Sequence, residues 1–95
     1  MKYELMLLLK PLTNEDIRDK VLTKVEKILR SLNGTLKIKD VIGKRLLAYK
    51  IKNYKEGYYV LCNIDLSSKK TMEFRKELKL TQDIIRFLLI QEEKL

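Results

Sequence analysis

The longest pattern in the sequence is an alternation of apolar and polar residues over residues 41–66, which predicts two strands joined by a short turn. The second half of this segment keeps one phase throughout. The apolar residues on one side of that strand are Tyr58, Val60, Cys62, Ile64 and Leu66. We expect the rest of the chain to support this hairpin.

The first strand of the hairpin, residues 35–51, changes phase part-way along. Apolar side chains hold even positions up to Ile38 and odd positions from Leu47 onward. A single extra residue at Gly43, a β-bulge, would bring both parts onto one face. At ~3.3 Å per residue the strand would be roughly 55 Å long, against about 26 Å for the strand predicted at residues 3–10. We therefore expect the hairpin to extend beyond its sheet.

The remaining apolar residues predict two helices and two further strands. Residues 3–10 are apolar on both faces, as a central strand requires. A first helix has its N-cap at Thr13, continues to about Leu32 and ends at Asn33-Gly34.

A second, shorter helix begins at Ser67 or Ser68 and ends near Lys79. Residues 84–90 form a last strand, and residues 91–95 form a short polar tail. The sequence contains no repeat and no linker, so we expect one domain.

The element order, strand, helix, strand, strand, helix, strand, indicates an α+β fold over residues 1–95. With right-handed crossovers it becomes a ferredoxin-like βαββαβ fold, a four-stranded antiparallel sheet with both helices on one face. The other face, called here the open face, then carries apolar residues from adjacent strands, which favours a partner over scattered surface residues. We expect it to display Met6, Leu8, Tyr59, Leu61, Arg86 and Leu88.

The chain is basic, with 21 Lys and Arg against 13 Asp and Glu, a net charge of +8 and a pI near 9.6. Such a balance favours polyanionic partners. The hairpin between positions 37 and 55, called here the basic arm, has one acidic residue before its turn, Asp40. Its cations are Lys37, Lys39, Lys44, Arg45, Lys50, Lys52 and Lys55. Phosphate binding explains this arm better than protection of an edge strand from aggregation, although Lys37 and Lys39 suit that second role.

Several kinds of chemistry are excluded by residue types. The chain has no histidine and one cysteine, Cys62, so catalytic triads, histidine metal sites and disulfides are not available. Its glycines lie far apart and form no phosphate-binding loop. No apolar run approaches the ~20 residues of a membrane span, and the N-terminus does not fit a signal peptide. We therefore expect that the protein is not an enzyme and that it binds no metal, cofactor, membrane or small-molecule substrate. The single cysteine suits a reducing compartment.

Four stretches together resemble the bacterial-type small-subunit ribosomal protein six family, over nearly the whole chain. They are Lys2-Tyr3-Glu4 before a strand ending near Pro11, Gly43-Lys44-Arg45-Leu46-Leu47-Ala48-Tyr49-Lys50-Ile51, Gly57-Tyr58-Tyr59, and Leu78 with the last strand. The resemblance implies a structural constituent of the small subunit. It also implies binding to the central domain of small-subunit ribosomal RNA, jointly with small-subunit protein eighteen.

By position, the resemblance assigns RNA contacts to Lys44, Arg45 and Tyr49 of the basic arm. It also assigns them to Tyr59 of the third strand, Arg86 of the last strand and Lys2 near the N-terminus. The charge of the basic arm adds Lys50 and Lys52. The open face would receive the protein partner through Met6, Leu8, Leu61 and Leu88. Lys50 replaces a family proline, Leu46 replaces a basic residue, and the tail is short.

Two other functions stay open at this point. A free-standing single-strand RNA-binding module of the RRM type shares the fold, but Leu61 stands where a second stacking ring is wanted. A small-ligand sensor or enzyme would pair two sheets around a pocket, for which the chain lacks convergent carboxylates. We expect the protein to be a monomer when isolated. In the cell we expect it to be bound to a ribosome of the cytoplasm or of an organelle.

Overall fold

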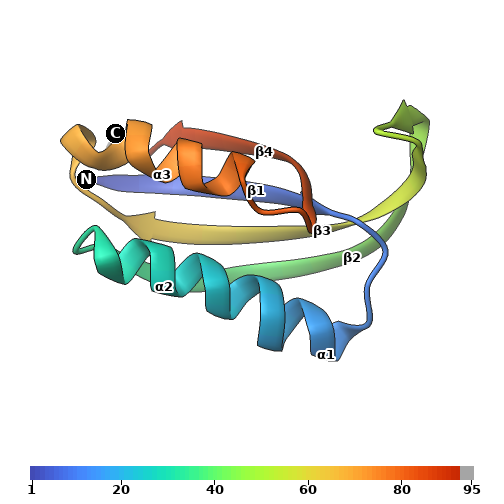
Figure 1. The fold of residues 1–95 in the computed structure, drawn as a ribbon, viewed down its shortest axis with the longest axis horizontal. Helices are drawn as coiled ribbons and strands as arrows, with labels where there is room; N and C mark the ends of the chain where they lie inside the picture. The colour runs from blue at the N-terminus through green and yellow to red at the C-terminus, as the bar shows by residue number, and fades with distance from the viewer. Residues whose placement is uncertain (93–95) are drawn as a thin grey trace.

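The computed structural model describes residues 1–92, apart from the side chain of Asn14 (Figure 1). Four strands and two helical units follow one another in the predicted order. The elements are β1 (Lys2–Leu9), α1 (Asn14–Asp16), η1 (Ile17–Leu22), α2 (Thr23–Ser31), β2 (Thr35–Ile51), β3 (Tyr54–Asp65), η2 (Ser68–Lys70), α3 (Thr71–Lys79) and β4 (Ile84–Gln91). The first helix is continuous through α1, η1 and α2, with a π-helical middle, and the second begins with the 3₁₀ turn η2.

The sheet has the strand order β2-β3-β1-β4, and every neighbouring pair is antiparallel. The central strand β1 therefore pairs with β3 on one side and with β4 on the other. This arrangement confirms the predicted ferredoxin-like fold (Figure 1).

One core lies between the sheet and the helices. Helices α2 and α3 contribute Val25, Leu29, Phe74 and Leu78, all fully buried. They pack on the sheet face formed by Tyr3, Leu5, Leu7, Leu9, Val60, Cys62 and Ile64. Burying an aliphatic or aromatic side chain of this size stabilises the fold by about 1.5 to 3 kcal/mol each, so this layer holds the two helices on the sheet.

The first helix begins and ends where the sequence predicts. Thr13 Oγ1 accepts a hydrogen bond from the Asp16 backbone N–H at 3.1 Å, which is an N-cap. At the other end the left-handed residue is Asn33, with a φ of 61°, and the Gly34 N–H donates to the Leu29 carbonyl at 2.7 Å. Gly34 is needed for a different reason, because a Cβ there would lie 2.8 Å from the carbonyl oxygen of Asp65.

The second helix begins with a cap at Ser67. Its Oγ accepts a hydrogen bond from the Lys69 N–H at 3.3 Å, which confirms one of the two predicted caps. At the other end of the chain, Gln91 belongs to β4 and not to a tail. The Glu92 N–H continues the pairing by donating to the Lys2 carbonyl at 2.9 Å. Residues 93–95 of the predicted tail lie outside the described residues.

The hairpin is more irregular than the predicted single bulge. The pairing of β2 with β3 shifts between Val41 and Gly43, as expected, but also between Ile38 and Asp40 and between Leu46 and Ile51. A straight strand of this length would measure roughly 55 Å, whereas the Cα atoms of the molecule extend over 34 × 29 × 21 Å. The hairpin therefore leaves the sheet and curls, as Figure 1 shows, because each bulge bends and twists the strand.

The turn at the tip of the hairpin uses two residues with positive φ, Lys52 at 49° and Asn53 at 71°. Such values are typical of the tight two-residue turns that match the twist of paired strands. The turn is closed by the pair Ile51 and Tyr54. Within residues 1–92 no helix is long and apolar enough to cross a membrane.

Candidate nucleic-acid interface

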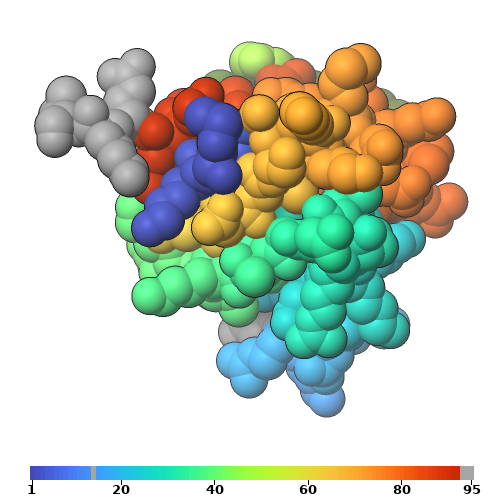
Figure 2. Space-filling view, turned by 90° about the vertical axis from the view of Figure 1, so that its left-hand side faces the viewer, coloured from blue at the N-terminus to red at the C-terminus, as the bar shows by residue number. Residues whose placement is uncertain are grey.

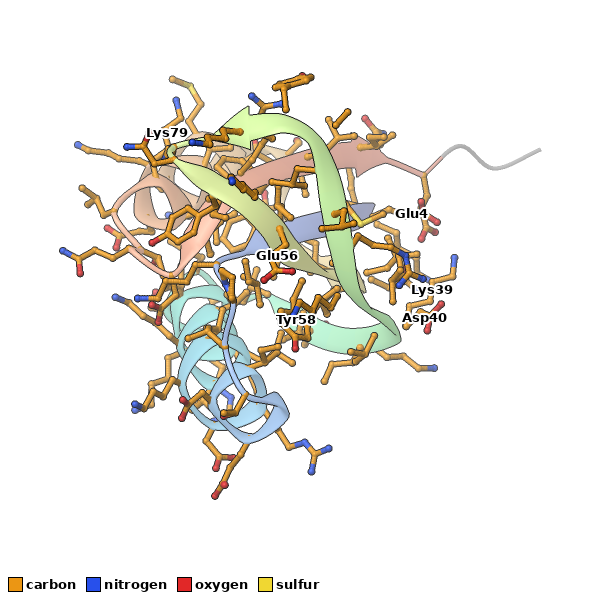
Figure 3. The ribbon with its side chains drawn as sticks, turned by 90° about the vertical axis from the view of Figure 1, so that its right-hand side faces the viewer. Glu4, Lys39, Asp40, Glu56, Tyr58 and Lys79 are labelled. Carbon is orange, nitrogen blue, oxygen red and sulfur yellow. The ribbon has the colours of Figure 1, made fainter. Side chains whose placement is uncertain are left out.

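Two cations of the basic arm are partly neutralised by the chain itself. Lys39 Nζ lies 3.0 Å from Glu4 Oε1, and this hydrogen bond raises the pKa of Lys39 (Figure 3). Lys44 Nζ lies 3.2 Å from Glu56 Oε2. Ion pairs between exposed side chains stabilise a fold little, so Lys44 can exchange Glu56 for a phosphate.

The other five cations of the basic arm are exposed and form no ion pair with any residue that the structure describes. They are Lys37, Arg45, Lys50, Lys52 and Lys55. Arg45 lies opposite Gly57 in the hairpin, and within residues 1–92 its guanidinium donates only to the neighbouring Lys44 carbonyl, at 2.8 Å. Tyr49, on the same strand, is 68% exposed. The arm therefore presents uncompensated positive charge together with an accessible aromatic ring.

The residues predicted for the open face form two of its rows, across the three strands β3, β1 and β4. In one row Met6 of β1 pairs with Leu61 of β3 and with Leu88 of β4. In the next row Leu8 pairs with Tyr59 and with Arg86. All six residues predicted for this face thus share it.

The exposure of these residues is uneven. Leu88 is 56% exposed, and Met6 and Leu61 are half-buried, so this row offers apolar contact area. Leu8 is only 3% exposed, because β3 approaches it closely at Gly57. The predicted contact residue Leu8 therefore supports the face from beneath and offers almost no surface of its own.

Lys2 lies apart from the other predicted RNA contacts. It pairs with Asp65 at the end of β3 remote from the hairpin turn, and Figure 2 shows the N-terminal residues beside β3 and β4 at that end of the molecule. The predicted RNA contacts thus fall into three places: the basic arm, the open face with Tyr59 and Arg86, and the remote end with Lys2.

Sequence reasoning missed two cations that the fold brings close to the predicted RNA-binding residues Lys52 and Arg86. Arg75 and Lys79 of α3 line one groove together with Lys52 and Arg86. Their spacing of four residues places them on one side of the helix, but no local pattern relates that side to the tip of the hairpin.

Cys62 is a core residue, as predicted. It is fully buried, and burial raises the pKa of its thiol to about 11, which makes it unreactive near neutral pH. Among residues 1–92 no three carboxylates or thiols gather as a metal site would need.

Comparison with known proteins identifies the family. The sequence model of ribosomal protein S6 matches residues 2–91. The chain belongs to the ribosomal protein S6 family. As an S6-family protein it is a component of the small ribosomal subunit, and its family is one of structural proteins, which are not enzymes.

Curated relatives of this chain carry the name small ribosomal subunit protein bS6. The protein of Exiguobacterium sibiricum is 32% identical over 93 residues, which cover 98% of each chain. The protein of Gloeobacter violaceus is 36% identical over 92 residues, covering 97% of this S6-family chain and 96% of its own. The crystal structure of 30S ribosomal protein S6 from Thermotoga maritima superposes with a TM-score of 0.78 at 29% identity, covering 96% of this chain and 86% of that one.

Proposed function

We propose that this S6-family protein binds small-subunit ribosomal RNA through the basic arm, together with small-subunit protein eighteen, which packs on the open face. The observation that carries the proposal is the group of exposed, unneutralised cations on a curled hairpin that borders the open face. Gathering like charges on one element is unfavourable unless an anion neutralises them.

The arm suits phosphate better than a protein carboxylate. Lys44 and Arg45 are consecutive in β2, opposite Tyr58 and Gly57, so their side chains point to opposite faces of the hairpin. Cations that project in different directions suit contacts along a polyanion. Each phosphate neutralised by Lys or Arg releases bound counterions and adds about 0.7 to 0.9 to the dependence of log affinity on log salt. Tyr49 can stack on an unpaired base at the same time.

The open face suits a protein partner. The row Leu61, Met6 and Leu88 is apolar and accessible, and apolar surface of this kind on a small domain usually belongs to an interface. Tyr59 and Arg86 in the adjoining row place a hydrogen-bonding group and a cation next to that surface. RNA and protein partner would therefore meet along the boundary between the arm and the open face.

The RRM-type alternative has less support. Of the side chains that the structure places on the open face, Tyr59 has the ring suited to stacking, and Leu61 occupies the next position on that face. Phe87 pairs with Leu7 and packs on the helix side. Tight binding to short unstructured oligonucleotides without any protein partner would favour this alternative.

The experiment is a salt titration of RNA binding. The full chain is titrated against transcribed small-subunit ribosomal RNA in the presence of small-subunit protein eighteen, for wild type and for Lys44→Gln/Arg45→Gln. Loss of two phosphate contacts lowers the slope of log affinity against log salt by about 1.4 to 1.8.

A matched control keeps the net charge of the variant equal. Lys24→Gln/Lys27→Gln removes two exposed cations from α2, on the far side of the core from the open face. We expect the control to keep the wild-type slope. Equal slopes for both double variants would contradict the assignment of RNA binding to the basic arm.

A monomeric state before assembly and a cytoplasmic or organellar ribosome stay predictions.

A further inference from the structure

A groove of about 590 Å³ lies at the free edge of β4, between the hairpin tip and α3. Four cations line this β4 groove: Lys52, Arg75, Lys79 and Arg86. Its lining contains no carboxylate, and its apolar part includes Leu78 and Phe87. Figure 3 shows Lys79 next to the curled hairpin, whose tip carries Lys52.

The four cations come from three elements that are far apart in the sequence. Lys52 lies in the turn after β2, Arg75 and Lys79 lie one helical turn apart on α3, and Arg86 lies on β4. None of them forms an ion pair within residues 1–92. Because all four cations line one groove, their fields reinforce one another on an anion bound in it.

The polar contacts inside the groove leave these charges available. Arg75 Nη2 reaches the Leu89 carbonyl at 3.4 Å, a long hydrogen bond that holds the guanidinium at the strand edge without neutralising it. Arg86 lies beside Leu8 in the second row of the open face. The β4 groove is therefore continuous with the open face through Arg86 and with the basic arm through Lys52.

We infer that the β4 groove binds the phosphodiester backbone of RNA, and that the RNA path continues from the basic arm around the edge of β4 onto α3. This inference rests on the proposed function and adds Arg75 and Lys79 to it. Four cations around an apolar floor exceed what one free phosphate needs, and they suit successive phosphates whose sugars or bases contact the half-buried Phe87.

The first test uses Arg75→Gln/Lys79→Gln in the same titration against small-subunit ribosomal RNA with protein eighteen. We expect the slope of log affinity against log salt to fall by about 1.4 to 1.8, the effect of two lost phosphate contacts. The control is Lys69→Gln/Lys76→Gln, which removes equal charge from η2 and α3 at positions that do not line the groove. All four side chains are exposed, and the groove variant loses one long hydrogen bond of Arg75, so thermal unfolding should stay close to wild type.

The second test maps the RNA directly. A hydroxyl-radical source is attached to Lys79→Cys or, in a separate protein, to Lys44→Cys, both with Cys62→Ala. We expect each position to cleave the RNA, at different nucleotides. Attachment at Lys24→Cys, on the outer side of α2, should leave the RNA intact.

The outcomes separate the inference from the proposed function. If the arm variant has its effect while the groove variant follows its control and position 79 cleaves nothing, the β4 groove holds no RNA and the proposed function stands. If the arm variant also follows its control, the inference about the β4 groove and the proposed function are both wrong. A groove variant that binds RNA normally but loses an acidic protein partner would likewise overturn the inference.

Discussion

Gly57 and Leu8 lie so close together that a Cβ on Gly57 would meet Cδ1 of Leu8 at 2.6 Å and the carbonyl oxygen of Leu9 at 2.9 Å. Strand β3 can pass over the end of β1 only because position 57 has no side chain. The same approach buries Leu8 on a sheet face that is otherwise partly exposed. Gly57 therefore links the hairpin to the sheet that supports it.

Gly57→Ala should destabilise the protein by about 1 to 3 kcal/mol, because the added methyl group must displace backbone as well as a side chain. Denaturant unfolding measures this loss. In a Leu8→Ala background the penalty should shrink, since one of the two clashing atoms is gone. Gly43→Ala serves as the control: nothing lies within 4 Å of its Cβ, and its φ of +94° alone opposes the substitution, so its cost should not depend on Leu8. Additive effects at positions 57 and 8 would contradict the contact.

The buried thiol of Cys62 makes stability depend on pH. Burial raises its pKa from 9.0 to about 11, so the folded chain holds the proton more tightly than the unfolded chain. This contribution is complete below pH 9 and is lost as the pH rises toward 11. Between pH 8 and pH 10.5 the free energy of unfolding of wild type should fall by roughly 2 kcal/mol more than that of Cys62→Ala. Parallel curves for the two proteins would show that the thiol is not desolvated.

The open face gives a prediction about the protein partner. Leu88→Asp places a charge at the β4 end of the apolar row, on its most exposed side chain, and should weaken binding of small-subunit protein eighteen about 10-fold to 100-fold, as expected for an interface hot spot. Isothermal titration of the two proteins, with ribosomal RNA present, measures the effect. Met72→Asp is the matched control, because Met72 is 82% exposed but lies on α3, away from the open face. Equal affinities for the two variants would place the partner elsewhere.

The fold was predictable because its signals are local. The caps at Thr13 and Ser67, the stop at Asn33-Gly34 and the two-residue period of β3 each depend on neighbours in the sequence. Gly43 signalled one bulge correctly. The shifts after Ile38 and Leu46 carry no glycine, so they had no comparable signal.

The candidate site was predictable only in part, since its shape depends on the curl of the hairpin. The pattern placed Met6, Leu61 and Leu88 on one face correctly, because register follows from alternation. It did not show that Leu8 is buried, nor that Arg75 and Lys79 come close to the hairpin tip. Those facts depend on contacts between elements distant in sequence, and one strand's period contains no information about them.

The register shifts also affect the protein before it joins a ribosome. Both outer strands of the sheet are irregular: β2 has its three shifts, and the pairing of β4 with β1 skips Ile85 between Ile84 and Arg86. A straight, regular edge would offer another copy of the chain a template for fibre growth, whereas a kinked edge does not, and on β2 exposed lysines add to this protection. We therefore expect newly made chains to stay unpolymerised at high concentration until they reach their binding site.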